Sequence, residues 1–360
     1  MNKQILQILG ALVIGIGVIL AVIAINDVSQ AANAWTPTAN LVPATETRAA
    51  PTLTIVPPTA KEATPNANDM MLSENVAGTY LIEQSGTKSD PVVIDGNGFT
   101  AQCVKVTGSH VTVKNFIVED CESHAILILG NDVTVENNTV RYSVTENGKV
   151  NCDNPDGGWG SGIKAERGSH DVTIRGNKVY ENCGEGIAST MSYNVLIEGN
   201  TVWDNFSVNI YVDNSYNVTV QNNVVYCSGI YLRAGKRPTG ISFAEESYKD
   251  WGTQRHDNSA ISNQVNGCDA GIVSWISELP TGREVRLLIE GNRIFHTIGR
   301  SIELNTVNVD VIIRGNISDK PVFVREPGGS TVTGNIEISA TPSPLATVSV
   351  TVTSTLTTVP

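Results

Sequence analysis

Acidic, basic and aromatic side chains recur at equivalent positions of several short segments in the middle of the chain. Counted from a recurring Ile, one segment carries Lys164 and Glu166, and another carries Tyr211 and Asp213. Paired carboxylates can serve as general acid and base, or as acid and nucleophile, at a glycosidic bond. A base beside a sugar carboxylate can instead start an elimination, if a cation neutralises that carboxylate. The residues expected to carry such chemistry are Asp213, Glu245, Glu166 and Lys164.

The spacing of the carboxylates decides which reaction they suit. If the segments are neighbouring strands about 4.8 Å apart, Asp213 and Glu245 lie on adjacent strands with their carboxyls roughly 5 Å apart. Glu166 and Asp213 are then two strands apart, roughly 10 Å. Retaining hydrolysis needs carboxyls about 5–5.5 Å apart, and inverting hydrolysis needs about 6.5–9.5 Å. The alternative is that each carboxylate is a solvated surface residue.

Other side chains near these positions could bind a substrate. Tryptophan rings can stack on sugars, although Trp275 could equally cap local packing. Arg233 could neutralise a substrate carboxylate, and an acidic cluster could hold Ca²⁺, the only cofactor that we consider. Trp251 could also stack on a sugar ring, and Lys236, Arg237 and His256 could reach in from loops. The predicted substrate-binding residues are Tyr211, Trp275, Trp159, Glu185, Arg233 and Glu246.

A repeat positions all of these residues. Its unit has two apolar residues two apart, then Asn, then another apolar residue, as in Val133/Val135/Asn138 and Val195/Ile197/Asn200. Where the repeat is regular, the Asn position, or its equivalent, recurs after 22, 23, 23 and 24 residues. A Gly or another small residue followed by Ile precedes the units by eight or nine residues. The period-2 alternation predicts strands, with alternate residues inward. About ten units of three short strands predict a stacked solenoid.

The quoted units resemble the right-handed parallel β-helix repeats of the pectate-lyase-like superfamily, over about Val92 to Asn335. The resemblance implies an all-β, single-stranded right-handed parallel β-helix of about ten rungs with three strands each. It implies that the Asn residues form a buried ladder in one turn. In carbohydrate-active relatives, the substrate groove runs over the outer face of the first strand, here the Gly-Ile strand. The compact Asp clusters and Arg pairs of calcium-dependent pectate lyases are missing, which puts that activity in doubt.

Two departures from the repeat flank this face. Residues 144–161 and 227–239 are insertions before first strands, and residues 247–257 are an insertion after one. Long loops on a rigid scaffold usually carry function, although surface decoration is the alternative. The small residue before each Ile, such as Gly162 or Gly186, predicts an open floor for the groove.

The six cysteines permit fifteen disulfide pairings in an exported protein. We expect a Cys152–Cys183 bridge that pins the first insertion to the groove wall, and Cys227 could pair with Cys268. Cys103 aligns with the inward Ile column, which predicts a buried thiol and not a third bridge. A nucleophilic Cys121–His124 pair is an alternative that we do not favour. No spacing resembles a zinc site.

The ends of the chain differ from the middle. Ile8 to Ile25 is an uncharged apolar run, so residues 1–34 are either a cleaved signal peptide or a membrane anchor. Residues 35–70 and 340–360 are Thr/Pro-rich and predict an extended linker and tail around a folded domain at 71–339. Either N-terminal role places the protein outside the cell or on its surface.

The expected function is modification or cleavage of a polysaccharide in the groove by an exported monomer. The alternative is a non-catalytic glycan-binding or structural surface module. The net charge of −12 argues against nucleic acid as a partner. Contact with a membrane is expected only through the N-terminal segment.

Overall fold

The computed structural model describes residues 69–148, 152–154, 158–229, 236–246, 251, 256–276 and 283–338. The expected signal or anchor, most of the linker, the tail and Arg233 lie outside these residues. Within the described ranges, no helix is long and apolar enough to cross a membrane.

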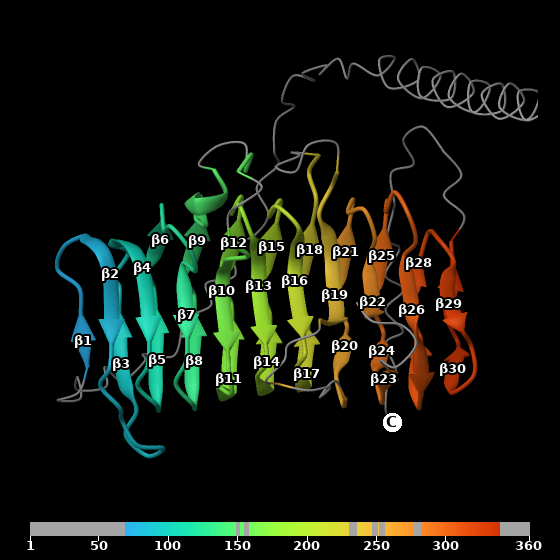
Figure 1. Cartoon of the computed structure of the whole chain (residues 1–360), viewed down its shortest axis with the longest axis horizontal. Helices are drawn as coiled ribbons and strands as arrows, with labels where there is room; N and C mark the ends of the chain where they lie inside the picture. Colours follow the sequence, from blue (N-terminus) through green and yellow to red (C-terminus); the bar gives the residue numbers. More distant parts are fainter. Residues whose placement is uncertain are drawn as a thin grey trace, which may run out of the picture. The chain divides into compact units, whose positions relative to one another are not determined.

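The described residues coil into a parallel β-helix, in which each turn of the chain places one strand on each of three columns (Figure 1). The first column runs through β2 (Val76–Ile82), β4 (Thr100–Val106), β7 (Ile126–Ile128), β10 (Ser161–Glu166), β13 (Glu185–Thr190), β16 (Val208–Asp213), β19 (Thr239–Glu245), β22 (Ile272–Ile276), β26 (Ile302–Val309) and β29 (Val322–Glu326). The second runs through β1 (Met70–Met71), β3 (Val92–Asp95), β5 (Val111–Lys114), β8 (Val133–Glu136), β11 (His170–Arg175), β14 (Tyr193–Glu198), β17 (Tyr216–Gln221), β20 (Ser259–Ile261), β24 (Leu288–Glu290), β27 (Val311–Arg314) and β30 (Ser330–Thr333).

The third column is built of shorter strands. It contains β6 (Ile117–Glu119), β9 (Thr139–Arg141), β12 (Lys178–Tyr180), β15 (Thr201–Trp203), β18 (Val224–Tyr226), β21 (Gln264–Asn266), β25 (Arg293–Phe295), β28 (Ile317–Ser318) and β31 (Ile336–Glu337). β23 (Arg283–Val285) pairs with β26, and η1 (Thr145–Asn147) is a 3₁₀ turn in the first insertion. The predicted all-β solenoid is confirmed.

The Ile of each first strand builds the core. Ile163 pairs in register with Ile187, Ile187 with Ile210, and Ile210 with Ile241, and all are fully buried. Because the pairing is parallel and in register, the residue that follows each Ile faces outward on the same column. This column carries the candidate site.

The predicted asparagine ladder is confirmed, and it includes the degenerate units. The Asn177 side chain donates to Asn200 Oδ1 at 3.0 Å, and the Asn177 backbone N–H donates to the same oxygen at 2.9 Å. The same pair of bonds links each step from Asn138 to Asn335. Every one of these buried amides is therefore paired with the next coil.

The prediction of an open floor was wrong. A Cβ atom at Gly186 would lie 2.6 Å from Asn205 Nδ2 and 2.7 Å from Val202 Cγ1. The small residue before each Ile therefore faces the interior, where coils approach too closely for a side chain. Asn209 occupies this column in its own coil and is fully buried, with Asn205 donating to its Oδ1.

All six cysteines are paired. The structure contains the expected Cys152–Cys183 bridge and a Cys227–Cys268 bridge. The prediction of a buried thiol at Cys103 was wrong, because a third bridge joins it to Cys121. Val104, and not Cys103, aligns with the Ile column through its pairing with Ile126. The bridge also removes the Cys121–His124 nucleophile as an alternative.

Candidate active site

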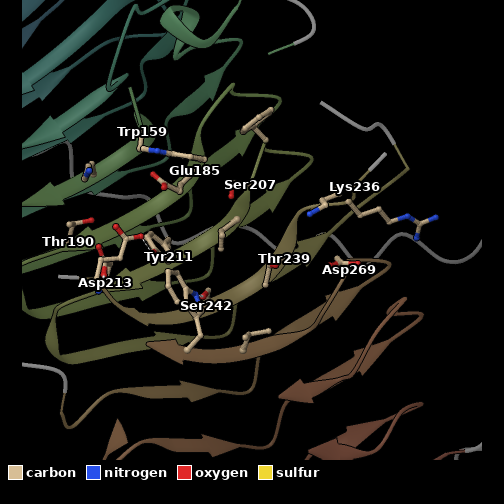
Figure 2. A pocket seen from close by; sticks show the side chains of 17 residues that line it. Trp159, Glu185, Thr190, Ser207, Tyr211, Asp213, Lys236, Thr239, Ser242 and Asp269 are labelled. Carbon is tan, nitrogen blue, oxygen red and sulfur yellow. Dashed lines mark hydrogen bonds between the residues drawn. The ribbon is translucent and has the colours of Figure 1, made fainter. Parts of the chain in front are cut away.

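A cavity of about 420 Å³ lies on the outer face of the first-strand column, between β10 and β22. In Figure 2, Thr190, Tyr211 and Asp213 gather toward one end of it and Lys236 and Asp269 lie toward the other. The residues that line it are Trp159, Lys164, Glu185, Thr190, Phe206, Ser207, Val208, Tyr211, Asp213, Lys236, Arg237, Thr239, Ser242, Glu246, Asp269, Val273 and Trp275.

Strand register explains the hollow. Lys164 pairs with Ala188, Ala188 with Tyr211, and Tyr211 with Ser242, so that small residues separate the large ones. These side chains point outward because the neighbouring Ile points inward. Short side chains between long ones leave the space that forms the cavity.

Seven of the predicted site residues line this cavity. They are Lys164, Glu185, Tyr211, Asp213, Glu246, Trp159 and Trp275. Lys236 and Arg237 also line it, as loop residues. The structure thus brings together charged and aromatic groups that are up to 116 residues apart in the sequence, from Trp159 to Trp275.

Glu245 and Glu166 do not line the cavity. Asp213 pairs with Ala244, so Glu245 falls one position later and Glu246 lies beside Asp213 instead. The Glu246 backbone N–H lies 3.3 Å from Asp213 Oδ1. Glu166 pairs with Lys164 at 3.8 Å and with Arg167 at 3.5 Å.

Two loop residues were also misplaced by the prediction. His256 stacks on Tyr216, with 4.8 Å between ring centroids, and therefore belongs to the second-strand face. Trp251 donates from Nε1 to the Asn214 carbonyl oxygen at 2.8 Å and does not line the cavity.

Glu185 is a carboxyl group of the cavity with a strongly raised pKa. Burial raises the pKa of Glu185 to about 7, although the Lys164 ammonium and a hydrogen bond from Ser161 oppose the shift. The Ser161 hydroxyl donates to Glu185 Oε2 at 2.7 Å. Only 6% of the Glu185 surface is exposed to solvent. A carboxyl with this pKa can hold a proton near neutral pH and release it, as a general acid must.

A half-buried histidine helps to fix Ser161, and sequence reasoning missed this role. The Ser161 backbone N–H donates to His124 Nδ1 at 3.1 Å. Burial, and then the Lys164 charge, lower the pKa of His124 to about 4. The ring is therefore neutral at neutral pH and accepts this bond. No periodicity points to His124, because it precedes its strand.

Tyr211 and Glu246 form a second polar pair in the cavity. The Tyr211 hydroxyl donates to Glu246 Oε1 at 2.8 Å. Burial and the neighbouring Asp213 and Glu246 carboxylates raise the pKa of Tyr211 far above its usual range. The phenol therefore stays protonated and serves as a donor.

Asn214 holds the Glu246 backbone in place and was also missed. Its side chain donates to the Glu246 carbonyl oxygen at 2.9 Å and accepts from the Glu246 N–H at 2.7 Å. Asn214 has a left-handed backbone with φ 47°, a conformation that Asn tolerates better than most residues. An Asn directly after a strand is the signal that could have revealed this turn.

Aromatic rings form part of the cavity wall. Trp159 comes from the first insertion, is 59% exposed and packs on Phe206 with 6.4 Å between ring centroids. Trp275 packs against Ala188, Tyr211 and Ala244, and its Nε1 donates to Ser242 Oγ at 3.1 Å. Trp275 therefore both lines the cavity and completes local packing.

The described residues contain no group of three His, Cys, Asp or Glu side chains arranged to hold a metal ion. We therefore assign no Ca²⁺ ligands among the described residues of the cavity and derive no step through a metal.

Known proteins share this architecture. A solved alginate lyase from Paenibacillus sp. str. FPU-7 superposes with a TM-score of 0.52 at 15% identity, over 76% of this chain and 89% of that one. Pectate lyase Pel9A gives 0.48 at 14% identity, over 78% and 70%. The Streptococcus pneumoniae surface protein and adhesin PfbA gives 0.44 at 12% identity, over 73% and 88%. At these identities the likeness concerns the fold alone.

Comparison of the sequence with family profiles and with curated proteins identifies the family but no individual relative. No curated protein sequence matches the chain significantly. The profile of the right-handed β-helix region matches residues 77–275, which is more than half of the chain. The parallel three-column coil, the repeat and this match agree, and the chain belongs to the right-handed β-helix family.

Proposed function

We propose that the protein binds a polysaccharide in the cavity on its first-strand face and cleaves or modifies it there. The observation that carries this proposal is the buried Glu185 carboxyl, protonated near neutral pH, in the same cavity as Lys164, Asp213 and Glu246. Groups with perturbed pKa values in a cavity are typical of active sites. The alginate lyase with the same fold supports the substrate class and suggests the first glycan to test.

Glu185 is the proton donor of the proposed reaction. In hydrolysis it protonates the leaving glycosidic oxygen, while Asp213 or Glu246 acts on the other side of the sugar ring. In elimination, the Lys164 ammonium neutralises the substrate carboxylate, the Asp213 or Glu246 carboxylate removes the adjacent C–H proton, and Glu185 protonates the leaving glycosidic oxygen. Trp159 offers an exposed ring on which a sugar can stack.

The proposed site of action is outside the cell. Three disulfides favour an oxidising compartment. The apolar run near the N-terminus would direct export, either as a cleaved signal or as an anchor. We propose that one copy of the chain suffices, because a single chain supplies every group named above. Ca²⁺ stays a prediction for the acidic-glycan case.

The test is a screen of the full chain against alginate, polygalacturonate and neutral glucans, for new reducing ends and for unsaturated products. We expect cleavage that falls at least 100-fold in Glu185→Gln and in Asp213→Asn. Glu198→Gln is the matched control, because Glu198 pairs with Gln221 away from the cavity. Unsaturated products would indicate elimination, and saturated ones hydrolysis.

Three results would count against the proposal. Cleavage that persists in both variants would remove the assigned site. Binding without cleavage would favour the glycan-binding module instead of an enzyme. Neither binding nor cleavage of any glycan would reject the carbohydrate-active role.

A further inference from the structure

Two of the three disulfides lie at the same turn of different coils, directly beside the cavity. Cys183 precedes Glu185 by two residues, and Cys268 immediately precedes Asp269. Both Glu185 and Asp269 line the cavity. The partners of these cysteines, Cys152 and Cys227, belong to the two insertions whose residues form the cavity walls.

The first bridge supports the aromatic wall. Cys152 and Cys183 form a small apolar cluster with Val144, and Phe206 packs against it. Trp159 in turn packs on Phe206. The Asn147 side chain also donates to the Cys183 carbonyl oxygen at 2.7 Å, which ties the turn to the insertion. The position of the Trp159–Phe206 wall therefore depends on contacts that converge on the bridge.

The second bridge supports the basic wall. Cys227 Sγ lies 3.5 Å from the Pro238 carbonyl oxygen, which also accepts from the Asp269 N–H at 3.0 Å. Arg237 Nη1 donates to the Gly267 carbonyl oxygen at 2.7 Å. Gly267 and Asp269 flank Cys268, so the loop that carries Lys236 and Arg237 is held at this bridged turn.

We propose that the Cys152–Cys183 and Cys227–Cys268 bridges position the two walls of the cavity, and that reducing them loosens the walls while the coil stack stays folded. The stack keeps its Ile column and its asparagine ladder, neither of which contains a cysteine. Ligand binding at the cavity then depends on the oxidised state. This last consequence rests on the proposed function, whereas the loosening of the walls does not.

The chemistry needs a dithiol as the reductant. One thiolate of the dithiol attacks a cystine sulfur, breaks the S–S bond and forms a mixed disulfide. The second thiolate of the reagent then closes a cyclic disulfide, and the two cysteine sulfurs leave as thiols after protonation. Two electrons pass from the dithiol to the cystine, and no other reactant is required.

The experiment compares three double variants of the full chain by hydrogen–deuterium exchange. Cys152→Ser/Cys183→Ser should exchange at least tenfold faster at residues 158–162 and 203–208, and Cys227→Ser/Cys268→Ser at residues 236–239 and 267–270. Peptides 172–179 and 195–202, within the stack, should not change. Cys103→Ser/Cys121→Ser is the matched control, since this bridge does not contact the cavity, and its walls should stay protected.

Titration of the wild-type chain with dithiothreitol keeps the test valid if a variant does not fold. Loosening confined to the walls supports the proposal. Walls that stay protected after reduction, or faster exchange throughout the stack, would overturn it. Binding of alginate or another glycan found in the screen should be lost at the same dithiol concentration. If no glycan binds the oxidised chain, the proposed function fails while the exchange data still decide the positioning role.

Discussion

Opposing influences act on the proton of the Glu185 carboxyl group. Burial favours the neutral carboxylic acid, the Glu246 carboxylate favours it further, and the Lys164 ammonium favours the carboxylate. Burial is the largest influence, and the Lys164 ammonium and then the Ser161 hydroxyl offset it only in part. A carboxyl group with this pKa holds a proton on a large fraction of molecules at neutral pH. Ionising it in the folded state lowers the free energy of unfolding, and this effect can be measured without a substrate.

The stability of the fold should therefore depend on Glu185. Its pKa rises from 4.5 to about 7 on folding, so between these pH values the folded chain binds more protons than the unfolded one. The free energy of unfolding must then fall as pH rises through this window, and the loss is complete above pH 7. Glu185→Gln cannot ionise, so at pH 8 it should be more stable than wild type by at most about 3 kcal/mol.

Urea unfolding at pH 4 and at pH 8 measures this difference. The variant and the wild type should be equally stable at pH 4, where Glu185 is protonated in both states. His124 titrates in an overlapping range with the opposite sign, but it contributes equally to both proteins and cancels. A pH-independent gap between the two proteins would show that Glu185 ionises normally.

At the scale of the strands, the close approach of the coils limits what can precede each Ile. Gly186 illustrates this limit, because the Asn209 carbonyl oxygen, the Asn205 side-chain amide and a Val202 methyl group lie where its Cβ would be. Gly186→Ala should cost about 1–3 kcal/mol of unfolding free energy through overpacking.

Gly328→Ala is the matched control for this substitution. A Cβ at Gly328 would meet no atom within 4 Å, and the residue is exposed. The control should change stability by less than about 0.5 kcal/mol. Equal denaturation midpoints for the two variants would contradict the interior position of the Gly186 column.

At the scale of the whole molecule, the repeat made the fold predictable. Each coil contacts its neighbours through the same Val, Ile and Asn positions, so one pattern recurs along the chain and specifies the solenoid. The outward column was predictable for the same reason, and it identified Lys164, Tyr211 and Asp213. These residues lie in strands without irregularities.

The predictions that were wrong or missing concern residues outside the regular outward column. The prediction for Glu245 was wrong although the register after the insertion is the one that Gly240-Ile241 indicates, because Glu245 has the same strand parity as the inward Ile241 and pairs with Ile276. Cys103 was misplaced at the first coils, where the Gly-Ile signature is missing. His124 and Asn214 act through turns, whose backbone conformation no alternation pattern records.

The asparagine ladder has an electrical consequence. In each step one N–H of the side-chain amide donates to the Oδ1 atom of the following coil, as Asn200 does to Asn223, while the second N–H donates to a backbone carbonyl oxygen of the preceding coil, here that of Ile174. The side-chain amides are therefore aligned head to tail from Asn138 to Asn335, and aligned hydrogen bonds polarise one another. Like the peptide units of an α-helix, they add up to one extended dipole, here with its negative end toward the first coils and its positive end toward the last. The stack of coils therefore carries a dipole along its axis that does not depend on the charges of the surface side chains.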